Sequence, residues 1–505
     1  MKATKIISLL LALVCLMGAL VACNDDDVVI DGGNRGENGN WDSVDFKGQK
    51  VNFCISVNQY DECTFPAANI YTKGPDTAGS NEVAREVLAR NAAAAKDLGV
   101  EIVYSTKDLT YNKILEDVRA IVQTASKTSP DIYNNDMYGL SRCMIDGLLW
   151  NVKDPGDDVK NYLNLNAEGF YTEFMKGCTF DQNKVYLVAG DYFIDMIRMA
   201  WVVYINNDLF EQNANKMPTW CQQGLDTFYE YIEAGCWDVD AMTDITGRVF
   251  VDGGMRGETE EDDPMVGVAI NPCVDWVISA SSQITLYYQD KENGYAPKVM
   301  ESIDDFQRVS NKYTALAEMQ GTFYDALVVD STKRFLNGNF LFAFSRLGEM
   351  ESAGLRDFSA AKGLVPVPKW NQNEQDEYHT VVHDQAELGC ILNTAKAYSA
   401  ASALLQYLNE ESDKVVYAYY DKGLKYKYND DKNARTMMDI VRETTDSPFG
   451  FQIGVLCQTL YTGSDTLKGL QGFENHATLG SLYASEKDAY KNCMKLMLEK
   501  FETLQ

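Results

Sequence analysis

The chain has 505 residues, which is too long for one hydrophobic core and fits two or three folding units. Its hydrophobic content of 46%, with 11% aromatic residues, is enough to bury sizeable cores. The formal net charge of -29 argues against nucleic acids and anionic membrane surfaces as partners, because their phosphates would be repelled.

The N-terminal segment has the pattern of an export signal. Lys2 and Lys5 form a positive start, residues 6–20 are a short apolar run, and small residues end at Cys23. The sequence LVAC at this point resembles the lipobox of bacterial lipoproteins, in which the cysteine is lipidated and becomes the new N-terminus. We expect residues 1–22 to be a lipoprotein signal peptide; the alternative is an ordinary cleaved leader with a chance cysteine.

Residues 23–45 are predicted to be a lipidated, flexible tether. The stretch 24–40 reads NDDDVVIDGGNRGENGN and has too little apolar surface to fold. Of the twelve cysteines, Cys15 lies in the leader and Cys23 in the lipobox, and the other ten are scattered singly through the body. None forms a CxxC pair, so neither a zinc ribbon nor a thioredoxin motif is indicated. The sequence leaves open whether these ten cysteines form disulfides or are buried as free thiols.

The first part of the body alternates strands and helices. We expect strands over 51–57, 100–104 and 131–136, and helices over 81–98 and 111–125. Asn81 is a predicted N-cap, and Gly99 is a predicted helix stop. This order favours a mostly parallel, doubly wound sheet, in which ligands sit beyond the carboxyl ends of the strands.

The middle of the chain, residues 191–232, is predicted to carry the crossing between two lobes. Residues 201–205 form an apolar strand, and Asn206, Asn207 and Asp208 supply turn chemistry directly after it. A helix follows over 225–232. Further strands are expected over 335–344, 364–368 and 380–382, and the last third of the chain is predicted to be helical.

No motif indicates catalysis, a metal site or a cofactor. His379, His383 and Glu387 stand four residues apart, but the residues between the histidines favour a strand, in which such positions lie about 13 Å apart. Asp238, Asp240 and Asp244 lack the remaining ligands of a calcium loop. No Walker loop, GxSxG elbow or strand-linked GxGxxG is visible.

Aromatic residues, amides and carboxylates recur together at the predicted strand ends. A sugar needs this mixture, since an aromatic ring covers its C–H face while amides and carboxylates bind its hydroxyls. Each residue alone is more often core or turn chemistry. The candidate ligand-binding residues are Tyr60, Asp61, Asn135, Tyr192, Asp195, Trp276, Arg346, Glu349 and Asp384.

Longer stretches of the sequence match the motifs of a known protein family. The passage VVYINNDLF followed by MPTW resembles the "YNKdlF … P.TW" segment of the extracellular solute-binding proteins of bacterial ABC importers, sugar-type family 1. YEYIEAGCW resembles the family's "lV..GkWT" helix end, from which Cys236 and Asp238 depart. GLVPVPKW, QDEYHTVVHDQAELGCI, LLQYLNEES, LKYKYNDDKNARTMMDI and PFGF then follow in the order seen in long Gram-positive members.

The resemblance implies a type II periplasmic-binding-protein fold with two α/β lobes joined by a hinge. The first lobe would comprise residues 46–190 plus about 384–430, the second residues 191–380, and the lobes would share C-terminal helices over about 431–505. The resemblance also implies a carbohydrate ligand, an oligosaccharide, and ABC permease subunits as partners. The body would be extracytoplasmic, anchored through Cys23 to the outer face of the cell membrane.

Two rival functions remain on sequence grounds. A SusD-like surface glycan-binding lipoprotein would share the size and the anchor, but that class is almost wholly helical. A secreted glycoside hydrolase would need a carboxylate pair, and the 74 acidic residues make chance pairs unavoidable. Strand content separates the first rival from the solute-binding protein, and release of reducing sugar separates the second.

Overall fold

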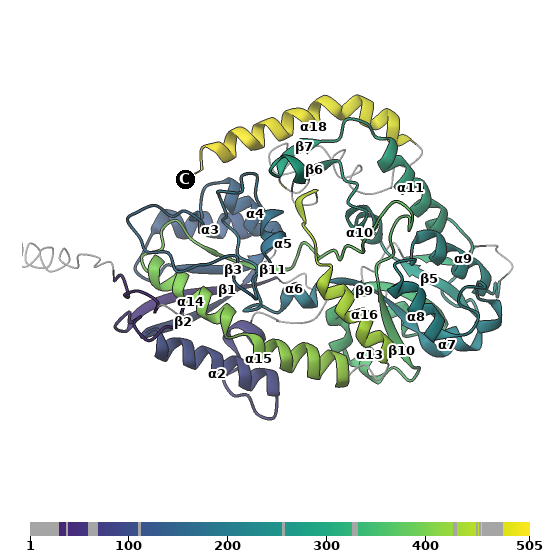
Figure 1. The fold of residues 1–505 in the computed structure, drawn as a ribbon, viewed down its shortest axis with the longest axis horizontal. Helices are drawn as coiled ribbons and strands as arrows, with labels where there is room; N and C mark the ends of the chain where they lie inside the picture. Colours follow the sequence, from purple (N-terminus) through teal and green to yellow (C-terminus); the bar gives the residue numbers. More distant parts are fainter. Residues whose placement is uncertain are drawn as a thin grey trace, which may run out of the picture.

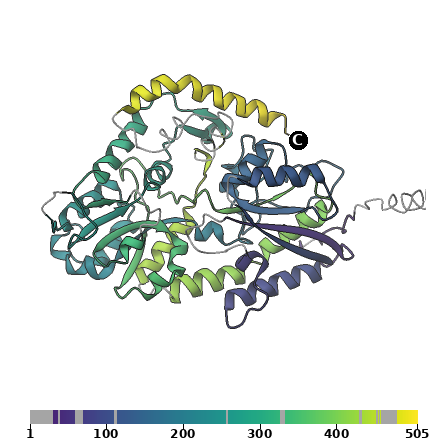
Figure 2. The same ribbon diagram turned by 180° about the vertical axis from the view of Figure 1, so that it is seen from behind.

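Two β-sheets, each at the centre of one lobe, set the architecture of the protein in this computed structural model (Figure 1). The structure describes residues 30–36, 39–58, 69–109, 113–254, 258–325, 332–427, 432–450, 453, 456 and 478–504. Seen from either side, the two lobes lie next to each other and helices bridge them above and below (Figures 1 and 2).

The first-lobe sheet is mostly parallel, as predicted. Its order is β11-β3-β1-β2. Central strand β1 pairs in parallel with both β2 and β3, and β11 is antiparallel to β3. The strands are β1 (Gln49–Asn58), β2 (Val100–Leu109), β3 (Ile132–Asp136) and β11 (Glu387–Ile391). β11 comes from the part of the chain predicted to be helical, so the sheet is completed by a segment far along the sequence.

The helix between β1 and β2 confirms two predicted signals. α2 (Glu82–Asp97) begins at Asn81, whose side chain accepts a hydrogen bond from the Ala84 amide at 3.1 Å. Gly99 has a φ of 63°, a left-handed conformation that glycine adopts without strain, and it turns the chain into β2. α3 (Ile114–Thr124) and α4 (Met137–Ile145) follow in the same lobe.

The second-lobe sheet is mixed, with the order β10-β4-β9-β5-β8. β4 is antiparallel to β9 and β10, whereas β5 is parallel to β8 and β9. The strands are β4 (Trp201–Asn206), β5 (Val266–Ile270), β8 (Thr322–Tyr324), β9 (Phe340–Arg346) and β10 (Lys362–Pro366). β10 occupies a sheet edge, where its terminal proline removes no ladder bond.

Two sequence predictions in this lobe are wrong in detail. Asn206, predicted to begin a turn, is the N-cap of α7 (Asn207–Gln212) and accepts a hydrogen bond from the Leu209 amide at 3.0 Å. The strand predicted over 335–344 begins at Phe340, because α12 (Thr332–Phe335) ends just before it. In both cases a polar turn signal marks a helix boundary.

The remaining elements connect and cover these sheets. Those of the two lobes are η1 (Asn69–Lys73), α5 (Thr172–Lys176), α6 (Asp195–Arg198), η3 (Ala214–Lys216), α8 (Leu225–Glu233), α9 (Val239–Val249), α10 (Val274–Ser281), β6 (Tyr287–Asp290), η4 (Lys291–Asn293), β7 (Ala296–Val299), α11 (Asp304–Ala317), η5 (Leu347–Glu351) and α13 (Ala353–Asp357). The C-terminal ones are α14 (Tyr398–Glu410), α15 (Asp413–Val416), η6 (Tyr417–Lys427), α16 (Lys432–Glu443) and α18 (Leu479–Glu502).

Two segments cross between the lobes and pair with each other. Ala200 and Val382 form an antiparallel bridge. The Trp201 amide donates to the Val381 carbonyl at 2.9 Å, and the His383 amide donates to the Met199 carbonyl at 2.9 Å. An antiparallel pair of chain segments therefore lies between the two sheets, and the lobe boundaries expected from the sequence stay a prediction.

The end of the predicted tether lies against the first lobe. Arg35 forms an ion pair with Glu410 of α14 at 3.0 Å, and the Trp41 indole donates to the same carboxylate at 3.1 Å. The Arg35 guanidinium also lies 4.2 Å from the Trp41 ring centroid. Residues 1–29, which include Cys23, lie outside the described residues.

Most of the described cysteines are free. The free ones are Cys54, Cys143, Cys178, Cys221, Cys236, Cys273 and Cys390. Cys493 on α18 is disulfide-bonded. Burial raises the pKa of most of the free thiols, to about 12 at Cys221, so they behave as small hydrophobic residues rather than nucleophiles.

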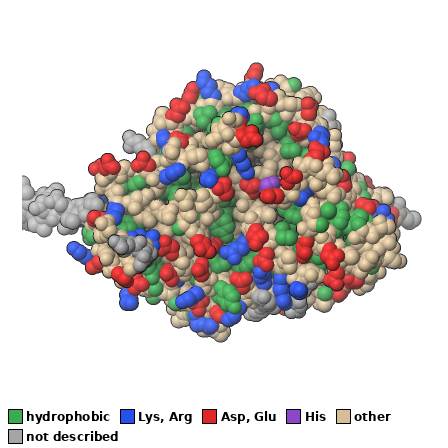
Figure 3. All heavy atoms as spheres, viewed as in Figure 1, with side chains coloured by type: hydrophobic (Ala, Val, Ile, Leu, Met, Phe, Trp, Pro, Cys, Tyr) green, Lys and Arg blue, Asp and Glu red, His purple; other side chains and the backbone are tan. Residues whose placement is uncertain are grey.

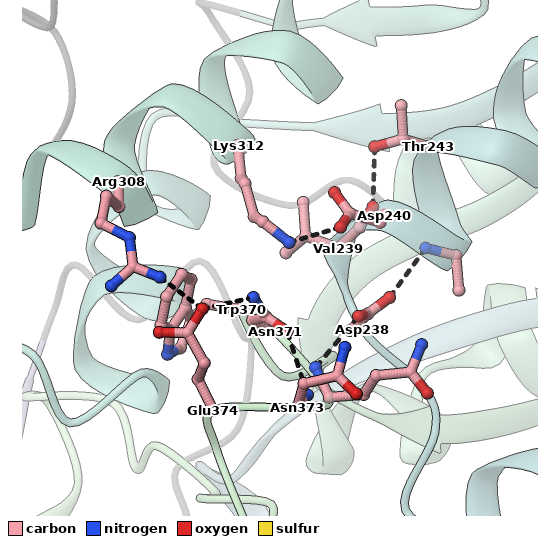
Figure 4. Close-up of polar contacts among 12 residues, drawn as sticks. Asp238, Val239, Asp240, Thr243, Arg308, Lys312, Trp370, Asn371, Asn373 and Glu374 are labelled. Atoms are coloured by element: carbon pink, nitrogen blue, oxygen red, sulfur yellow. Dashed lines mark hydrogen bonds and ion pairs between the residues drawn. The ribbon is translucent and has the colours of Figure 1, made fainter. Parts of the chain in front are cut away.

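The start of α9 is tied to the loop that follows β10 (Figure 4). Asp238, which is 2% exposed, accepts hydrogen bonds from the Ala241 amide at 2.9 Å and the Gln372 amide at 3.0 Å. The first bond caps the helix, and the second anchors the loop. Asp238 therefore has a structural role.

Trp370 in the same loop is covered by two cations from α11 (Figure 4). The Arg308 guanidinium lies 5.0 Å and the Lys312 ammonium 5.7 Å from the ring centroid. Arg308 pairs with Glu374, and Lys312 pairs with Asp240. The Arg308–Glu374 pair holds the loop against α11, and the Lys312–Asp240 pair joins α11 to α9. Each pair contributes little free energy alone.

Replacing Asp238 by Ala should destabilise the second lobe by about 1 to 3 kcal/mol, because the variant loses a helix cap and leaves a loop amide unbonded. Asp240→Ala is the matched control, since it removes only an exposed ion pair worth less than about 1 kcal/mol. Urea unfolding of both variants measures the difference. Equal losses would contradict the role assigned to Asp238.

Candidate functional site

The strand ends of the two lobes face one another across the crossover segments, and this region is the candidate site. In the first lobe, β3 ends in Asn135 and Asp136. The Asp136 carboxylate accepts a hydrogen bond from the Gly139 amide at 2.6 Å and caps α4, while the Asn135 side chain accepts one from the Asp136 amide at 2.7 Å. Both side chains are fully buried. The half-buried Tyr138 follows them.

Tyr138 was not among the predicted site residues. The Arg142 guanidinium lies 4.2 Å from the Tyr138 ring centroid, one helical turn further along α4. The Tyr138 amide donates to the Asp384 carbonyl at 3.2 Å, which joins the first lobe to the crossover. Its position directly after a strand end is the sequence signal that identifies Tyr138.

His383 and Asp384 occupy the returning crossover segment. The Asp384 carboxylate lies 2.8 Å from His383 Nδ1. The His383 ring stacks on Trp201, with centroids 5.9 Å apart, and meets Trp276 edge to face at 5.7 Å. The predicted residues Asp384 and Trp276 therefore both contact His383.

Trp276 lies near the start of α10 in the second lobe and is half-buried. Close by, burial raises the pKa of the Cys273 thiol to about 11, while a hydrogen bond with Trp276 lowers it. The charges of Asp384 and Arg346 also act on this thiol, in opposite directions. The predicted residues Trp276, Arg346 and Asp384 thus all lie close to Cys273, the first two from the second lobe and the third from the crossover.

Arg346 and Glu349 form a buried ion pair where β9 ends. Arg346 Nη2 lies 3.1 Å from a Glu349 oxygen, and both side chains are less than 5% exposed. Such a pair is stable only while each charge keeps its partner, because an unpaired charge is costly to bury. The pair fixes the second-lobe wall of the site.

Asp195 and Arg198 form a second buried pair on the outgoing crossover. Their nearest atoms are 2.6 Å apart, and Arg198 Nε lies 3.0 Å from Glu351. The Glu387 amide donates to Asp195 at 3.2 Å. Burial raises the pKa of the Asp195 carboxyl, and Arg198 opposes that shift. Asp195 therefore joins the crossover to β11.

Tyr192 is a core residue of the first lobe in this structure. Its side chain is 0% exposed, and its hydroxyl lies 3.4 Å from the Val188 carbonyl. A Cβ placed on Gly389 would come within 2.1 Å of that hydroxyl, so the ring is tightly enclosed. Tyr192 presents no surface to a ligand here. Tyr60 and Asp61 lie outside the described residues.

A pocket of about 340 Å³ lies beside the crossover, between residues 280–291 of the second lobe and residues 446–450. Its lining combines aromatic, amide, hydroxyl and charged side chains, which are Gln283, Thr285, Tyr288, Gln289, Lys291, His379, Thr380, Asp446, Ser447 and Phe449. His379 Nδ1 lies 2.6 Å from Asp446. Burial raises the pKa of the Asp446 carboxyl, but hydrogen bonds from His379 and Ser447 bring it below its usual value. The sequence analysis missed this pocket.

The side chains of the region offer hydrogen bonds and aromatic contacts. Among the described residues, no group of three or more His, Cys, Asp or Glu side chains could hold a metal ion. The buried carboxylates Asp195 and Glu349 and the partly exposed Glu351 are each paired with an arginine. Figure 3 shows acidic side chains spread over the visible face of the molecule, which agrees with the net charge of -29.

Replacing Tyr192 by Ala should destabilise the protein by about 3 to 5 kcal/mol, because it opens a cavity in the first-lobe core. Tyr192→Phe keeps the ring and should lose much less. Chemical unfolding of both variants gives the comparison. A Tyr192→Ala protein as stable as the parent would show that the side chain is not enclosed as described.

No family model and no curated protein matches the sequence. Solved structures do match. The galacto-N-biose/lacto-N-biose I-binding protein of an ABC transporter from Bifidobacterium longum has a TM-score of 0.51 and 11% identity, over 91% of this chain and 99% of that one. The cyclic α-maltosyl-1,6-maltose binding protein from Arthrobacter globiformis has a TM-score of 0.51 and 12% identity, over 89% and 99%.

A third match is the maltose/maltodextrin-binding domain from Bdellovibrio bacteriovorus, with a TM-score of 0.51 and 8% identity over 89% of this chain and 99% of that one. Within the described part of the chain, no helix is long and apolar enough to cross a bilayer. The protein has the two-lobe, type II periplasmic-binding-protein fold that these sugar-binding proteins share.

Proposed function

We propose that the protein is a solute-binding protein that holds a carbohydrate, an oligosaccharide, between its lobes and delivers it to an ABC importer. The observation that carries this proposal is the convergence of Tyr138, Trp276 and Asp384 from two lobes and the crossover at facing strand ends. Aromatic rings cover sugar faces, and carboxylates and amides bind hydroxyls. Such a ligand would lie between the two lobes, which can close on it by a hinge movement.

Binding without covalent chemistry fits the arrangement of charges. The arginines of the region are committed to carboxylates in buried pairs, which leaves rigid walls rather than a mobile acid and base. A carboxylate pair for glycoside hydrolysis would need one acid with a raised pKa facing an ionised partner across the bond. The four-stranded and five-stranded sheets also argue against membership of the SusD-like glycan-binding lipoproteins, because that class is almost wholly helical.

The lipid anchor at Cys23, the extracytoplasmic location and the permease partners belong to the same proposal. Their support is the lipobox-like sequence after a short apolar run and the fold of importer binding proteins. Metabolic labelling with a fatty-acid analogue in a lipoprotein-processing bacterium tests the anchor. Label on the parent and its loss in Cys23→Ala would support it, and equal label on both would refute it.

Oligosaccharides should stabilise the protein in a thermal-shift screen, and calorimetry of the best one should give a dissociation constant that Trp276→Ala raises about 10- to 100-fold. Loss of an aromatic ring against the sugar face is the cause. Trp220→Ala is the matched control, since Trp220 stacks on Tyr231 of α8 with centroids 3.9 Å apart, away from the candidate site. Stabilisation by peptides or metals instead of sugars would refute the proposal.

A further inference from the structure

The start of the described chain lies on the first lobe. We call residues 30–36 and 39–46 the brace. The brace contacts a surface of aromatic and charged side chains, which we call the seat and which comprises Lys160, Tyr162, Tyr407 and Glu410. Figures 1 and 2 both show this start of the chain at the end of the first lobe farthest from the second lobe. The seat therefore holds part of the segment that the sequence predicts to be a tether.

Glu410 of α14 binds two side chains of the brace. Arg35 Nη2 lies 3.0 Å from each Glu410 carboxylate oxygen, and the Trp41 indole donates to one of these oxygens at 3.1 Å. The Trp41 ring also lies close to two tyrosines of the seat, with its centroid 6.0 Å from that of Tyr162 and 5.7 Å from that of Tyr407. Trp41 is therefore held by ring contacts as well as by its N–H group.

A second set of contacts holds the beginning of the brace. Lys160 Nζ lies 3.1 Å from an Asp31 carboxylate oxygen, and the Tyr162 hydroxyl donates to the Asp31 carbonyl at 2.6 Å. A Cβ on Gly32 would come within 2.4 Å of the ring of Phe46, which is fully buried. Close contact with the first lobe therefore begins at the first few residues of the brace.

Backbone hydrogen bonds and apolar packing complete the brace. The Asp45 amide donates to the Gly32 carbonyl at 2.8 Å, and the Phe46 amide donates to the Leu98 carbonyl, just after α2, at 2.9 Å. Ile30 is partly buried and packs against the hydrophobic core. The brace is therefore a folded part of the first lobe.

The position of the brace limits how far the body can stand from a lipid anchor. Ile30 comes seven positions after Cys23. A fully extended chain spans at most about 3.6 Å per residue, so Ile30 lies no more than about 25 Å from a lipidated Cys23. A chain that was free as far as Ser43 would reach about 70 Å. The net charge of -29 opposes attraction to anionic lipids, so the length of the chain limits this distance.

We propose that the brace keeps the outer end of the first lobe turned toward the membrane, within about 25 Å of the lipid surface. The second lobe then lies farther from the bilayer on average, because the molecule is attached at one end. The membrane part of this inference rests on the lipid anchor of the proposed function. The brace itself does not, since its contacts are all within the protein.

Hydrogen exchange of the protein in solution tests the brace. Arg35→Ala/Trp41→Ala removes contacts from the side of the brace, and Glu410→Ala removes them from the side of the seat. Glu101→Ala is the matched control, since it removes only an exposed ion pair with Lys50 on the neighbouring strand. Residues 30–36 and 39–45 should exchange about 10-fold faster in both release variants than in the parent and the control, because their amides lose the folded brace.

Energy transfer to labelled lipid in phosphatidylcholine vesicles tests the orientation of the lipidated protein. A dye introduced as an unnatural amino acid replaces either Lys96, an exposed residue near the brace, or Val251, an exposed residue of the second lobe. Transfer should be stronger from position 96 than from position 251 in the parent. It should fall at position 96 in both release variants, since freeing residues 30–43 adds about 10 to 20 Å to the average length of free chain.

Parental exchange in both release variants would overturn the brace, and equal transfer from the two dye positions would overturn the orientation. If Arg35→Ala/Trp41→Ala fails to fold, Glu410→Ala decides, because the Glu410 side chain is 26% exposed and water can replace the lost contacts. If Cys23 carries no lipid, the protein does not attach to vesicles, and the orientation fails together with the anchor. The exchange experiment still decides the brace in that case.

Discussion

The antiparallel contact between the two crossover segments is the constraint on which the rest of the molecule depends. The bonds between Trp201 and Val381 and between His383 and Met199 fix both crossings at one point. From there each segment enters its sheet directly, as β4 on one side and as β11 on the other. The sheets are therefore held with their strand ends facing, and the candidate site follows from that geometry rather than from any one loop.

The arginine side chains around this contact form ion pairs with carboxylates. Arg198 sits between Asp195 and Glu351, and these carboxylates raise its pKa well above the usual value despite burial, which acts to lower it. The arginine therefore stays charged and links the crossover to both lobes. Arg346 with Glu349 repeats the arrangement where β9 ends. Buried pairs of this kind add little net stability but oppose alternative packings, since moving one partner leaves the other unpaired. They make the walls of the site rigid.

Local signals predicted the fold well, and long-range contacts limited the prediction of the site. Asn81 and Gly99 bound α2 as expected, because caps and left-handed glycines are set by neighbouring residues. Trp276, Arg346 and Asp384 were predicted from strand ends and all lie close to Cys273. Tyr192 fits the same pattern but is enclosed by Gly389, almost two hundred positions away in the chain, which sequence order does not reveal. The contacts of Tyr71 with Glu351 and of Phe449 with Phe180 were missed for the same reason, since only folding brings these distant parts of the chain together.

Hydrogen exchange measured with and without a panel of oligosaccharides tests the central claim, that a carbohydrate is held between the lobes, most directly. The account predicts that the bound sugar slows exchange at the facing strand ends of both lobes, in residues 137–142 and 271–276, and in the returning crossover over 383–387. Slowed exchange in one lobe only, or none with any sugar while another class of solute protects both lobes, would contradict it.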